Sequence, residues 1–273
     1  MRLVRHLSDM PFQELERGSV VTIGAFDGLH RGHEQLLRRV MAESRDRGMP
    51  SVVMSFEPTP KEFFSAAAPP ARLMRFREKF DSLANHGIDI FYCPRFSEAM
   101  RSISADAFIR RILVHGLNAR HIVIGDDFRF ARKREGTLDG LVRAGNALDY
   151  SVERVPSVIV DGIRVSSTAI RDALAAGDLA RATALLGRPY RMSGRIVRGR
   201  QVGRSLGYAT ANVDLRRRQS AVTGIYAVRV HGLPEGPIEG VASVGTRPTF
   251  DLTKPLLEVH LFDFDREIYG EYI

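Results

Sequence analysis

Short apolar segments rich in β-branched residues alternate with segments of helical periodicity through the first 186 residues, and no other sequence feature constrains the fold as strongly. The first pair is Ser19–Gly24 and Gly32–Arg47, in which apolar residues repeat at strand-like and helical spacings respectively. Further strands are predicted at Ser51–Phe56, Ile88–Cys93, His121–Gly125 and Ser151–Val160, and further helices at Phe76–His86, Ala105–His115 and Leu138–Leu148. This alternation indicates βαβ units and a parallel sheet, which binds ligands outside the carboxyl ends of its strands.

The pattern changes in the last third of the chain. Two short helices are predicted, one beginning near Ser167 and one capped by Asp178 and ending at Gly187. Beyond the linker-like Arg188–Tyr190, strands are predicted at Tyr190–Val197, Gly224–Val230, Gly240–Val244 and Leu256–Phe264. Closely spaced strands between Gly and Pro turns are typical of a small barrel or sandwich. We therefore predict an α/β domain at residues 1–186 and a β domain at residues 187–273.

Length and composition indicate a globular protein of two domains, since 273 residues exceed one typical domain. Cys93 is the only cysteine, which excludes an internal disulfide and suits a reducing cytosol. The N-terminus lacks the apolar core of a signal peptide, and no apolar run reaches the roughly 18 residues of a membrane span. We expect a soluble, cytoplasmic protein with no membrane partner, and the sequence predicts no oligomeric state.

The net charge of +8 favours anionic partners. The basic residues are scattered, apart from Arg132–Arg134 and Arg216–Arg218, and 32 acidic residues lie among them. Small phosphorylated ligands account for this balance as well as nucleic acid does, so nucleic acid is not the expected partner.

The first candidate site is the run Gly24–His33, in which a strand passes through a glycine-containing turn into a helix. This geometry points backbone N–H groups and the positive helix end at one place, which suits phosphate. His30 and His33 flank Gly32, and their imidazoles can donate hydrogen bonds to charge that develops on an α-phosphate. The alternative is a pair of solvated histidines at a helix start. Zinc is not expected, because no third ligand is apparent.

A second run of polar residues, Val165–Arg171, follows the last strand of the α/β domain and opens a helix. Its three hydroxyls, on Ser166, Ser167 and Thr168, predict either a helix cap or a phosphate cradle. Arg171, one turn into the helix, would then reach a β- or γ-phosphate.

The β domain contains a weaker set of candidates. Gly194 and Gly203 lie in an arginine-rich run that predicts either a phosphate-binding nest or a surface hairpin. Thr210 and Asn212 offer oxygen ligands that suit Mg²⁺. Strand periodicity puts Glu258 on the face opposite Val259 and Leu261, where it is either an exposed acid or a base for phosphoryl transfer.

These segments together resemble one family, the bifunctional riboflavin kinase/FAD synthetases of bacteria, over essentially the whole chain. Three segments resemble the adenylyltransferase half of the family: Gly24–His33, Gly125–Phe130 and Val165–Arg171. Three others resemble the kinase half: Gly203–Asn212, Ser243–Thr249 and Leu257–Gly270. The resemblance implies a Rossmann-like nucleotidyltransferase domain of the His-x-Gly-His type, followed by a small antiparallel β-barrel.

The resemblance also implies two reactions: ATP phosphorylates riboflavin to FMN, and FMN then attacks the α-phosphorus of ATP, with Mg²⁺ present, to give FAD and pyrophosphate. In adenylyl transfer, the implied catalytic residues are His30 and His33, the ATP-binding residues are Gly24, Phe26, Asp27, Gly32, Ser166, Ser167, Thr168 and Arg171, and the flavin or adenine pocket contains Asp126, Asp127 and Phe128. In the kinase reaction, Gly194, Gly203, Thr210 and Asn212 bind ATP, Thr210 and Asn212 hold the metal, and Glu258 takes the proton from the riboflavin 5′-hydroxyl.

Four positions depart from the family pattern. Thr59 stands where the family often has a histidine, and Thr59 cannot titrate near neutrality. Ala131 replaces a frequent glycine, in a loop expected to need positive φ. Ala209 replaces a proline that would stiffen the segment before the metal-binding threonine. The chain stops at Ile273, whereas family members continue through a further strand and a C-terminal helix, so we expect an incomplete kinase half.

Three alternatives stay open on the sequence. The first is an FMN adenylyltransferase with an inactive kinase half, and the second is a basic nucleic-acid-binding protein with a flavin-sensing role. The third is a fragment of a class I aminoacyl-tRNA synthetase, since those enzymes also carry a His-x-Gly-His site. The run Val165–Arg171 lacks the lysines expected of that third class.

Overall fold

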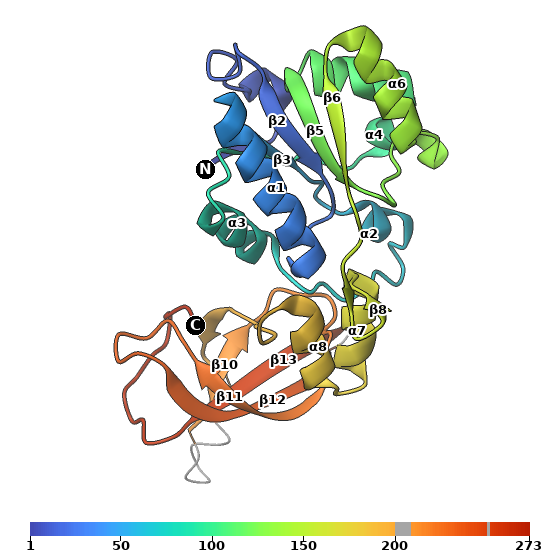
Figure 1. Cartoon of the computed structure of the whole chain (residues 1–273). Helices are drawn as coiled ribbons and strands as arrows, with labels where there is room; N and C mark the ends of the chain where they lie inside the picture. Colours follow the sequence, from blue (N-terminus) through green and yellow to red (C-terminus); the bar gives the residue numbers. More distant parts are fainter. Residues whose placement is uncertain (200–208, 250–251) are drawn as a thin grey trace. The chain divides into compact units, whose positions relative to one another are not determined.

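The computed structural model describes residues 1–199, 209–249 and 252–273 (Figure 1). The chain divides into two compact units, one made of Met1–Pro70 and Phe76–Ser166 and the other of Ala71–Arg75 and Ser167–Ile273. Among the described residues, every helix is too short or too polar to cross a lipid bilayer.

The first unit is built on a parallel sheet of six strands in the order β1-β4-β3-β2-β5-β6. Its strands are β1 Arg2–Val4, β2 Ser19–Ile23, β3 Ser51–Met54, β4 Ile90–Tyr92, β5 Ala119–Gly125 and β6 Ser151–Val155. Every residue of β2, β3 and β4 is buried. Strands buried on both faces need helices on both sides of the sheet, which is the predicted α/β arrangement.

Helices cover the two faces of this sheet (Figure 1). They are α1 Arg31–Arg47, α2 Pro60–Phe64, α3 Phe76–Asn85, α4 Glu98–Ser102, α5 Ala105–Ala107 and α6 Leu138–Leu148, with 3₁₀ turns at Leu7–Asp9 and Arg132–Arg134. A π-helical segment, Phe108–Val114, continues α5. It packs Phe108, Ile112 and Leu113 onto the sheet face that contains Val21 and Ile23.

The prediction of one strand over Ser151–Val160 is wrong. The segment divides into β6 and a short strand β7, Ile159–Val160, which forms an antiparallel hairpin with β8, Ile163–Arg164. Pro156 interrupts the strand because it has no N–H for the ladder. Ser157 then turns its N–H and its hydroxyl toward the carboxylate of Asp126, over 3.2 and 2.7 Å.

The second unit begins with the two predicted helices, α7 Ser167–Ala175 and α8 Leu179–Leu186. Asp178 caps α8 by accepting a hydrogen bond from the N–H of Arg181, and Gly187 ends it with φ of 82°. An antiparallel sheet of five strands follows in the order β11-β12-β13-β10-β9. Its strands are β9 Arg195–Val197, β10 Ala211–Asp214, β11 Gly224–Val230, β12 Ile238–Thr249 and β13 Leu252–Leu261. The predicted antiparallel β architecture is confirmed, and a boundary at residues 186 and 187 stays a prediction.

A segment from the N-terminal part of the sequence, Ala71–Arg75, belongs to the second unit. Arg171 Nε donates to the carbonyl of Ala71 over 2.6 Å, and Arg217 donates to the carbonyl of Arg72 over 3.0 Å. Arg75 itself donates to Ser193 Oγ over 3.1 Å. Backbone carbonyls and guanidinium groups thus fix this segment, which leads directly into α3 of the first unit.

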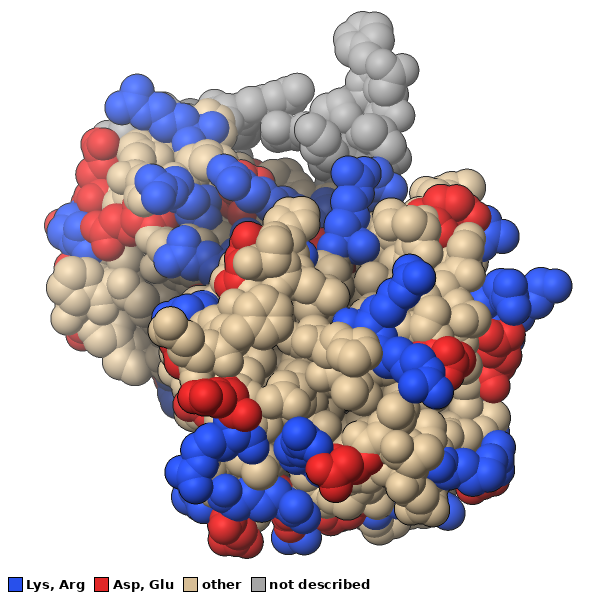
Figure 2. Space-filling model, turned by 90° about the horizontal axis from the view of Figure 1, so that it is seen from above, with Lys and Arg blue, Asp and Glu red and all other residues tan. Residues whose placement is uncertain are grey.

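Basic and acidic side chains are interspersed on the face of the molecule drawn in Figure 2. Ion pairs such as Arg110–Asp106 and Arg120–Asp149, at 2.8 and 2.5 Å, join neighbouring charges of opposite sign. On this face, the mixing agrees with the expectation from the sequence that the net charge of +8 is spread rather than gathered into one basic block.

Candidate active sites

The turn between β2 and α1 carries the His-x-Gly-His motif at the carboxyl end of a central strand. Gly24 donates its N–H to Met54 O over 3.0 Å as β2 ends. Phe26, Gly28 and Leu29 then adopt positive φ angles of 47°, 92° and 40°. Phe26 and Leu29 are 0% and 2% exposed, so the burial of their side chains offsets the cost of a left-handed backbone.

His30 is the N-cap residue of α1 and stacks on His33. Its Nδ1 accepts a hydrogen bond from the backbone N–H of His33, 3.3 Å away. Because a neutral imidazole carries one proton, an accepting Nδ1 puts the proton of His30 on Nε2. The two ring centroids lie 3.7 Å apart with 14° between the planes. Gly32 allows this approach, since a Cβ there would lie 3.3 Å from the His30 ring.

Burial keeps both histidines neutral. It lowers the pKa of His30 to about 4, against the opposing effects of a backbone hydrogen bond, Asp27 and Asp127. Burial, together with the neighbouring His30 and Lys79, holds the pKa of His33 well below its ordinary value. The Nδ1 atom of His33 is buried and has no hydrogen-bond partner within the described part of the chain. Each ring therefore offers one N–H rather than a positive charge, which suits hydrogen bonds to phosphate oxygens.

The expected flavin or adenine residues after β5 have protein partners. Hydrogen bonds from Ser157 lower the pKa of Asp126, and Arg164 pairs with Asp127 over 2.7 Å. Phe128 is half-buried and packs against the hydrophobic core. Asp126 and Asp127 thus hold the β7–β8 hairpin beside the end of β5. The charge of Asp127 also raises the pKa of His30, against the larger effect of burial. Contact of these residues with a flavin or adenine stays a prediction.

Lys79 on α3 is a residue that sequence reasoning missed. Its side chain is buried, and its Nζ donates to the carbonyl of Ala25, 2.6 Å away and 54 positions earlier in the chain. A signal was present in the sequence, since Lys79 lies one turn before Leu83 on the apolar face of the predicted helix. A charged residue at an apolar helical position is unusual enough to mark a site.

The second polar run lies where the two compact units meet in sequence. Ser166 ends the first unit, whereas Ser167, Thr168 and Arg171 belong to α7 of the second unit. The Nε of Arg171 is already used by the carbonyl of Ala71. The joint action of these residues with the two histidines on ATP therefore stays a prediction.

Two kinase candidates, Asn212 and Glu258, lie on β10 and β13, which pair so that the two residues are opposite each other. The predicted alternation of β13 is confirmed, because Val259 and Leu261 are buried and Glu258 is half-exposed on the other face. Thr210 lines a cavity of about 190 Å³ between β10, β13 and residues 264–269. Neither Asn212 nor Glu258 lines that cavity. That Thr210, Asn212 and Glu258 act together on one bound ATP stays a prediction.

The glycines of the arginine-rich run differ from the expected nest. The N–H of Gly194 donates to Ile273 O over 2.9 Å, so this amide is already hydrogen-bonded within the protein rather than directed at a phosphate. Gly199 instead lies against Asn212, where a Cβ would come within 2.2 Å of the amide nitrogen. Gly203 lies outside the described residues. The carbonyl of Ala209 accepts a hydrogen bond from Nδ1 of His260 over 2.9 Å, which fixes the segment where the family has proline.

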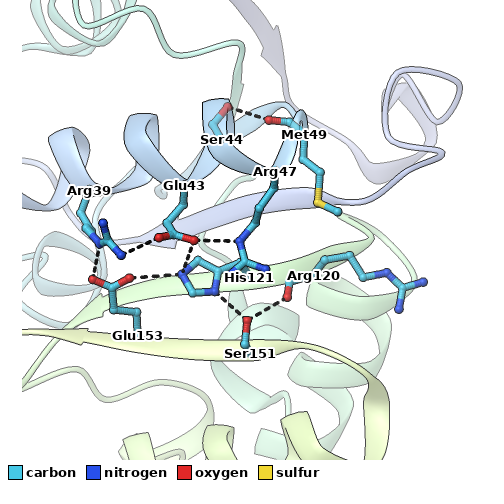
Figure 3. A network of polar contacts seen from close by, with 9 residues as sticks. All are labelled: Arg39, Glu43, Ser44, Arg47, Met49, Arg120, His121, Ser151 and Glu153. Atoms are coloured by element: carbon cyan, nitrogen blue, oxygen red, sulfur yellow. Dashed lines mark hydrogen bonds and ion pairs between the residues drawn. The ribbon is translucent and has the colours of Figure 1, made fainter.

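A group of Glu43, His121 and Glu153 has metal-ligand chemistry but is already neutralised (Figure 3). Arg39 bonds both carboxylates over 2.5 Å, and Arg47 bonds Glu43 over 2.7 Å. His121 Nε2 lies 3.3 Å from Glu153 and 3.6 Å from Glu43. The two guanidinium groups therefore balance the two carboxylates, and the network joins α1 to β5 and β6.

A parallel α/β unit with a stacked His-x-Gly-His pair at its first central strand-to-helix turn defines the chain as a nucleotidyltransferase, joined to a second, antiparallel β unit. Two family models match in this order: FAD synthetase over residues 12–169 and riboflavin kinase over residues 186–273. The chain belongs to the family of bifunctional riboflavin kinase/FMN adenylyltransferases, a family of transferases, as its resemblance to that family implied.

Several relatives match over nearly the whole chain. Bifunctional riboflavin kinase/FMN adenylyltransferase of Escherichia coli strain K12 is 45% identical over 273 residues, which are 100% of this chain and 87% of that protein. Its counterpart in Pseudomonas fluorescens is 44% identical and covers 98% of this chain and 86% of its own length. A crystal structure from Streptococcus pneumoniae, described as that of a macrolide-efflux protein, superposes with a TM-score of 0.82 at 32% identity, covering 99% of this chain and 87% of that one.

Proposed function

We propose that this chain makes FAD from riboflavin in two steps, with ATP as the second substrate of each. The kinase half phosphorylates the 5′-hydroxyl of riboflavin to give FMN and ADP. The adenylyltransferase half transfers AMP from ATP to FMN and releases pyrophosphate. The observation that carries the proposal is the pair of stacked, neutral histidines at the N-terminus of α1. That pair supplies donors for a polyphosphate at the end of a parallel sheet where ligands bind.

In adenylyl transfer the chain stabilises charge and positions the reactants. An oxygen of the FMN phosphate attacks the α-phosphorus of ATP, the new P–O bond forms, and the bond to pyrophosphate breaks. His30, through Nε2–H, and His33 donate hydrogen bonds to oxygens whose negative charge grows in this step. Gly24, Phe26, Asp27 and Gly32 shape the turn around ATP. The hydroxyls of residues 166–168 and the Arg171 side chain are further candidates for binding the ATP phosphates.

In the kinase step the riboflavin 5′-hydroxyl attacks the γ-phosphorus of ATP, and Glu258 takes the hydroxyl proton. The Thr210 hydroxyl and the Asn212 amide oxygen would hold Mg²⁺, because hard oxygen ligands are those that Mg²⁺ prefers. When bound, the ion would neutralise charge on the phosphates. The opposition of Asn212 and Glu258 across β10 and β13 supports a shared site.

The proposed setting is the cytoplasm. A single buried cysteine, Cys93, suits a reducing compartment, and riboflavin, FMN and ATP are the proposed small-molecule partners.

One incubation tests both halves of the proposal. Purified protein receives isotope-labelled riboflavin, unlabelled FMN, ATP and Mg²⁺, and the flavins are separated and weighed by mass spectrometry. We expect labelled FMN, labelled FAD and unlabelled FAD. Unlabelled FAD alone would leave the adenylyltransferase and remove the kinase from the proposal. No FAD of either mass from folded protein would overturn the proposal.

A further inference from the structure

The ammonium group of Lys79 lies inside the first unit, against the turn that carries the two histidines. Lys79 is 3% exposed, and its Nζ lies 2.6 Å from the carbonyl oxygen of Ala25 and 3.5 Å from Ser55 Oγ. The Ser55 hydroxyl donates to the same carbonyl over 3.2 Å. One backbone oxygen thus receives two hydrogen bonds, one of them charge-assisted and therefore the stronger. Burial of a charged amine is costly, so its position needs a compensating role.

The Ala25 carbonyl, which accepts the hydrogen bond from Lys79, directly precedes the part of the turn with positive φ angles. Phe26 follows at once with φ of 47°, and Leu29 has φ of 40°. The Phe26 ring contacts the ring of His33, with 5.0 Å between centroids and 43° between planes. A continuous path of contacts therefore runs from Lys79 through the Ala25 carbonyl and Phe26 to His33.

Lys79 also acts on His33 through its charge. It is one of the groups that keep the pKa of His33 low, after burial and the neighbouring His30. The other charged groups that act on the pair are Asp27 in the turn and Asp127 after β5, both on His30. A positive charge at this depth also favours the approach of anionic phosphates to the turn.

We propose that Lys79 is a positioning residue for adenylyl transfer, which holds the Ala25 carbonyl and, through Phe26, sets the His33 ring toward the ATP phosphates. The inference rests on the proposed adenylyltransferase function and adds to it a residue outside the motif, on α3. The residue acts through the turn rather than by contact with the reacting atoms.

The test compares Lys79→Met, which keeps length and loses both charge and donors, with Lys79→Arg, which keeps them. Arg77→Met on the exposed side of the same helix is the matched control. For Lys79→Met we expect kcat for FMN adenylylation to fall about 10- to 100-fold, as for loss of a charged hydrogen bond. The acid limb of its pH profile should move to higher pH, because His33 loses a neighbouring cation. Lys79→Arg should restore part of the rate and the acid limb, and Arg77→Met should match the wild type.

Two results would overturn the inference: a folded Lys79→Met protein with wild-type kcat, or equal losses and identical pH profiles for the Met and Arg variants, which would indicate packing alone. If Lys79→Met does not fold, Lys79→Gln takes its place, since glutamine loses the charge but remains polar at this buried position. A several-fold fall in adenylylation with unchanged kinase rate supports the inference, and an unchanged adenylylation rate overturns it. Failure of the wild type to make FAD would instead overturn the proposed function.

Discussion

At the scale of single residues, the structure shows what two departures from the family pattern, Thr59 and Ala131, do. Thr59 is the N-cap of α2, where it exchanges hydrogen bonds with Glu62 in a capping box, so a helix cap replaces the family's histidine. Ala131 has φ of 63° and ψ of −173°, a combination populated almost only by glycine. The expectation that this loop needs positive φ is confirmed.

We predict that Ala131→Gly stabilises the first unit by about 1 kcal/mol, because relief of backbone strain exceeds the extra entropy of glycine in the unfolded chain. Thermal unfolding should show a rise in Tm of about 2–4 °C for a unit of this size. Ala147→Gly, in the exposed part of α6, is the control and should lower Tm, since glycine weakens a helix. A lower Tm for Ala131→Gly would contradict the strained assignment.

The two nitrogens of His30 have separable roles, which gives a second residue-scale prediction. In His30→Asn the amide oxygen keeps the cap of α1, because asparagine is a favoured N-cap, but the Nε2–H donor is lost. We expect an almost unchanged Tm and a loss in FAD formation of about 100-fold or more. Circular dichroism melting and a fixed-time assay of FAD from FMN measure both. A variant with wild-type rate would exclude His30 as a donor to the reacting phosphate.

At the scale of elements, the sequence predicts what local periodicity encodes. The segments α1, α6 and β2 were predicted because apolar residues repeat over many positions. The strand β10, Ala211–Asp214, was missed because three of its four residues are alanine, asparagine and aspartate, which are depleted in strands. The apolar helix face marked Lys79 as unusual, but its contact with Ala25 was missed because folding brings the two residues together from 54 positions apart. Motifs within one turn are visible in sequence, whereas contacts between elements are not.

The network that joins α1 to β5 and β6 predicts acid sensitivity of the first unit. Burial lowers the pKa of His121. The hydrogen bond that Glu43 accepts from Arg47 lowers the pKa of Glu43. For both groups, as for His30, the unfolded chain binds protons at a higher pH than the folded chain. Their contributions are therefore complete above the unfolded pKa values and are lost as pH falls toward the folded ones.

We expect the free energy of unfolding to decrease as pH falls from 7 to 4. His30 alone, with a pKa that drops from 6.5 to about 4 at 7% exposure, contributes on the order of 3 kcal/mol between these pH values. Denaturant unfolding at several pH values measures the slope. His121→Gln should make the slope shallower, and His6→Gln, at an exposed position, should leave it unchanged. Stability that is flat between pH 7 and 4 would contradict these pKa directions.

At the scale of the whole molecule, the candidate catalytic residues of the two reactions belong to different compact units. The histidine pair and Lys79 belong to the first unit, and Asn212 and Glu258 belong to the second. The sequence predicted this division of labour through the family resemblance, whereas the assignment of Ala71–Arg75 to the second unit had no sequence signal.

Separate sites predict separable and complementing activities. His33→Ala should abolish formation of FAD from FMN and leave phosphorylation of riboflavin nearly intact, while Glu258→Ala should lower only the kinase step. Neither variant alone should then convert riboflavin efficiently to FAD. An equimolar mixture should do so, because FMN made by the His33→Ala protein can diffuse to the intact adenylyltransferase site of the Glu258→Ala protein. Labelled riboflavin followed by mass spectrometry measures both steps.

If His33→Ala stopped both activities in a folded protein, the two-site assignment would be wrong. If each variant behaved as expected but the mixture made no labelled FAD, FMN would have to pass between sites without release, and the active unit would be the single intact chain.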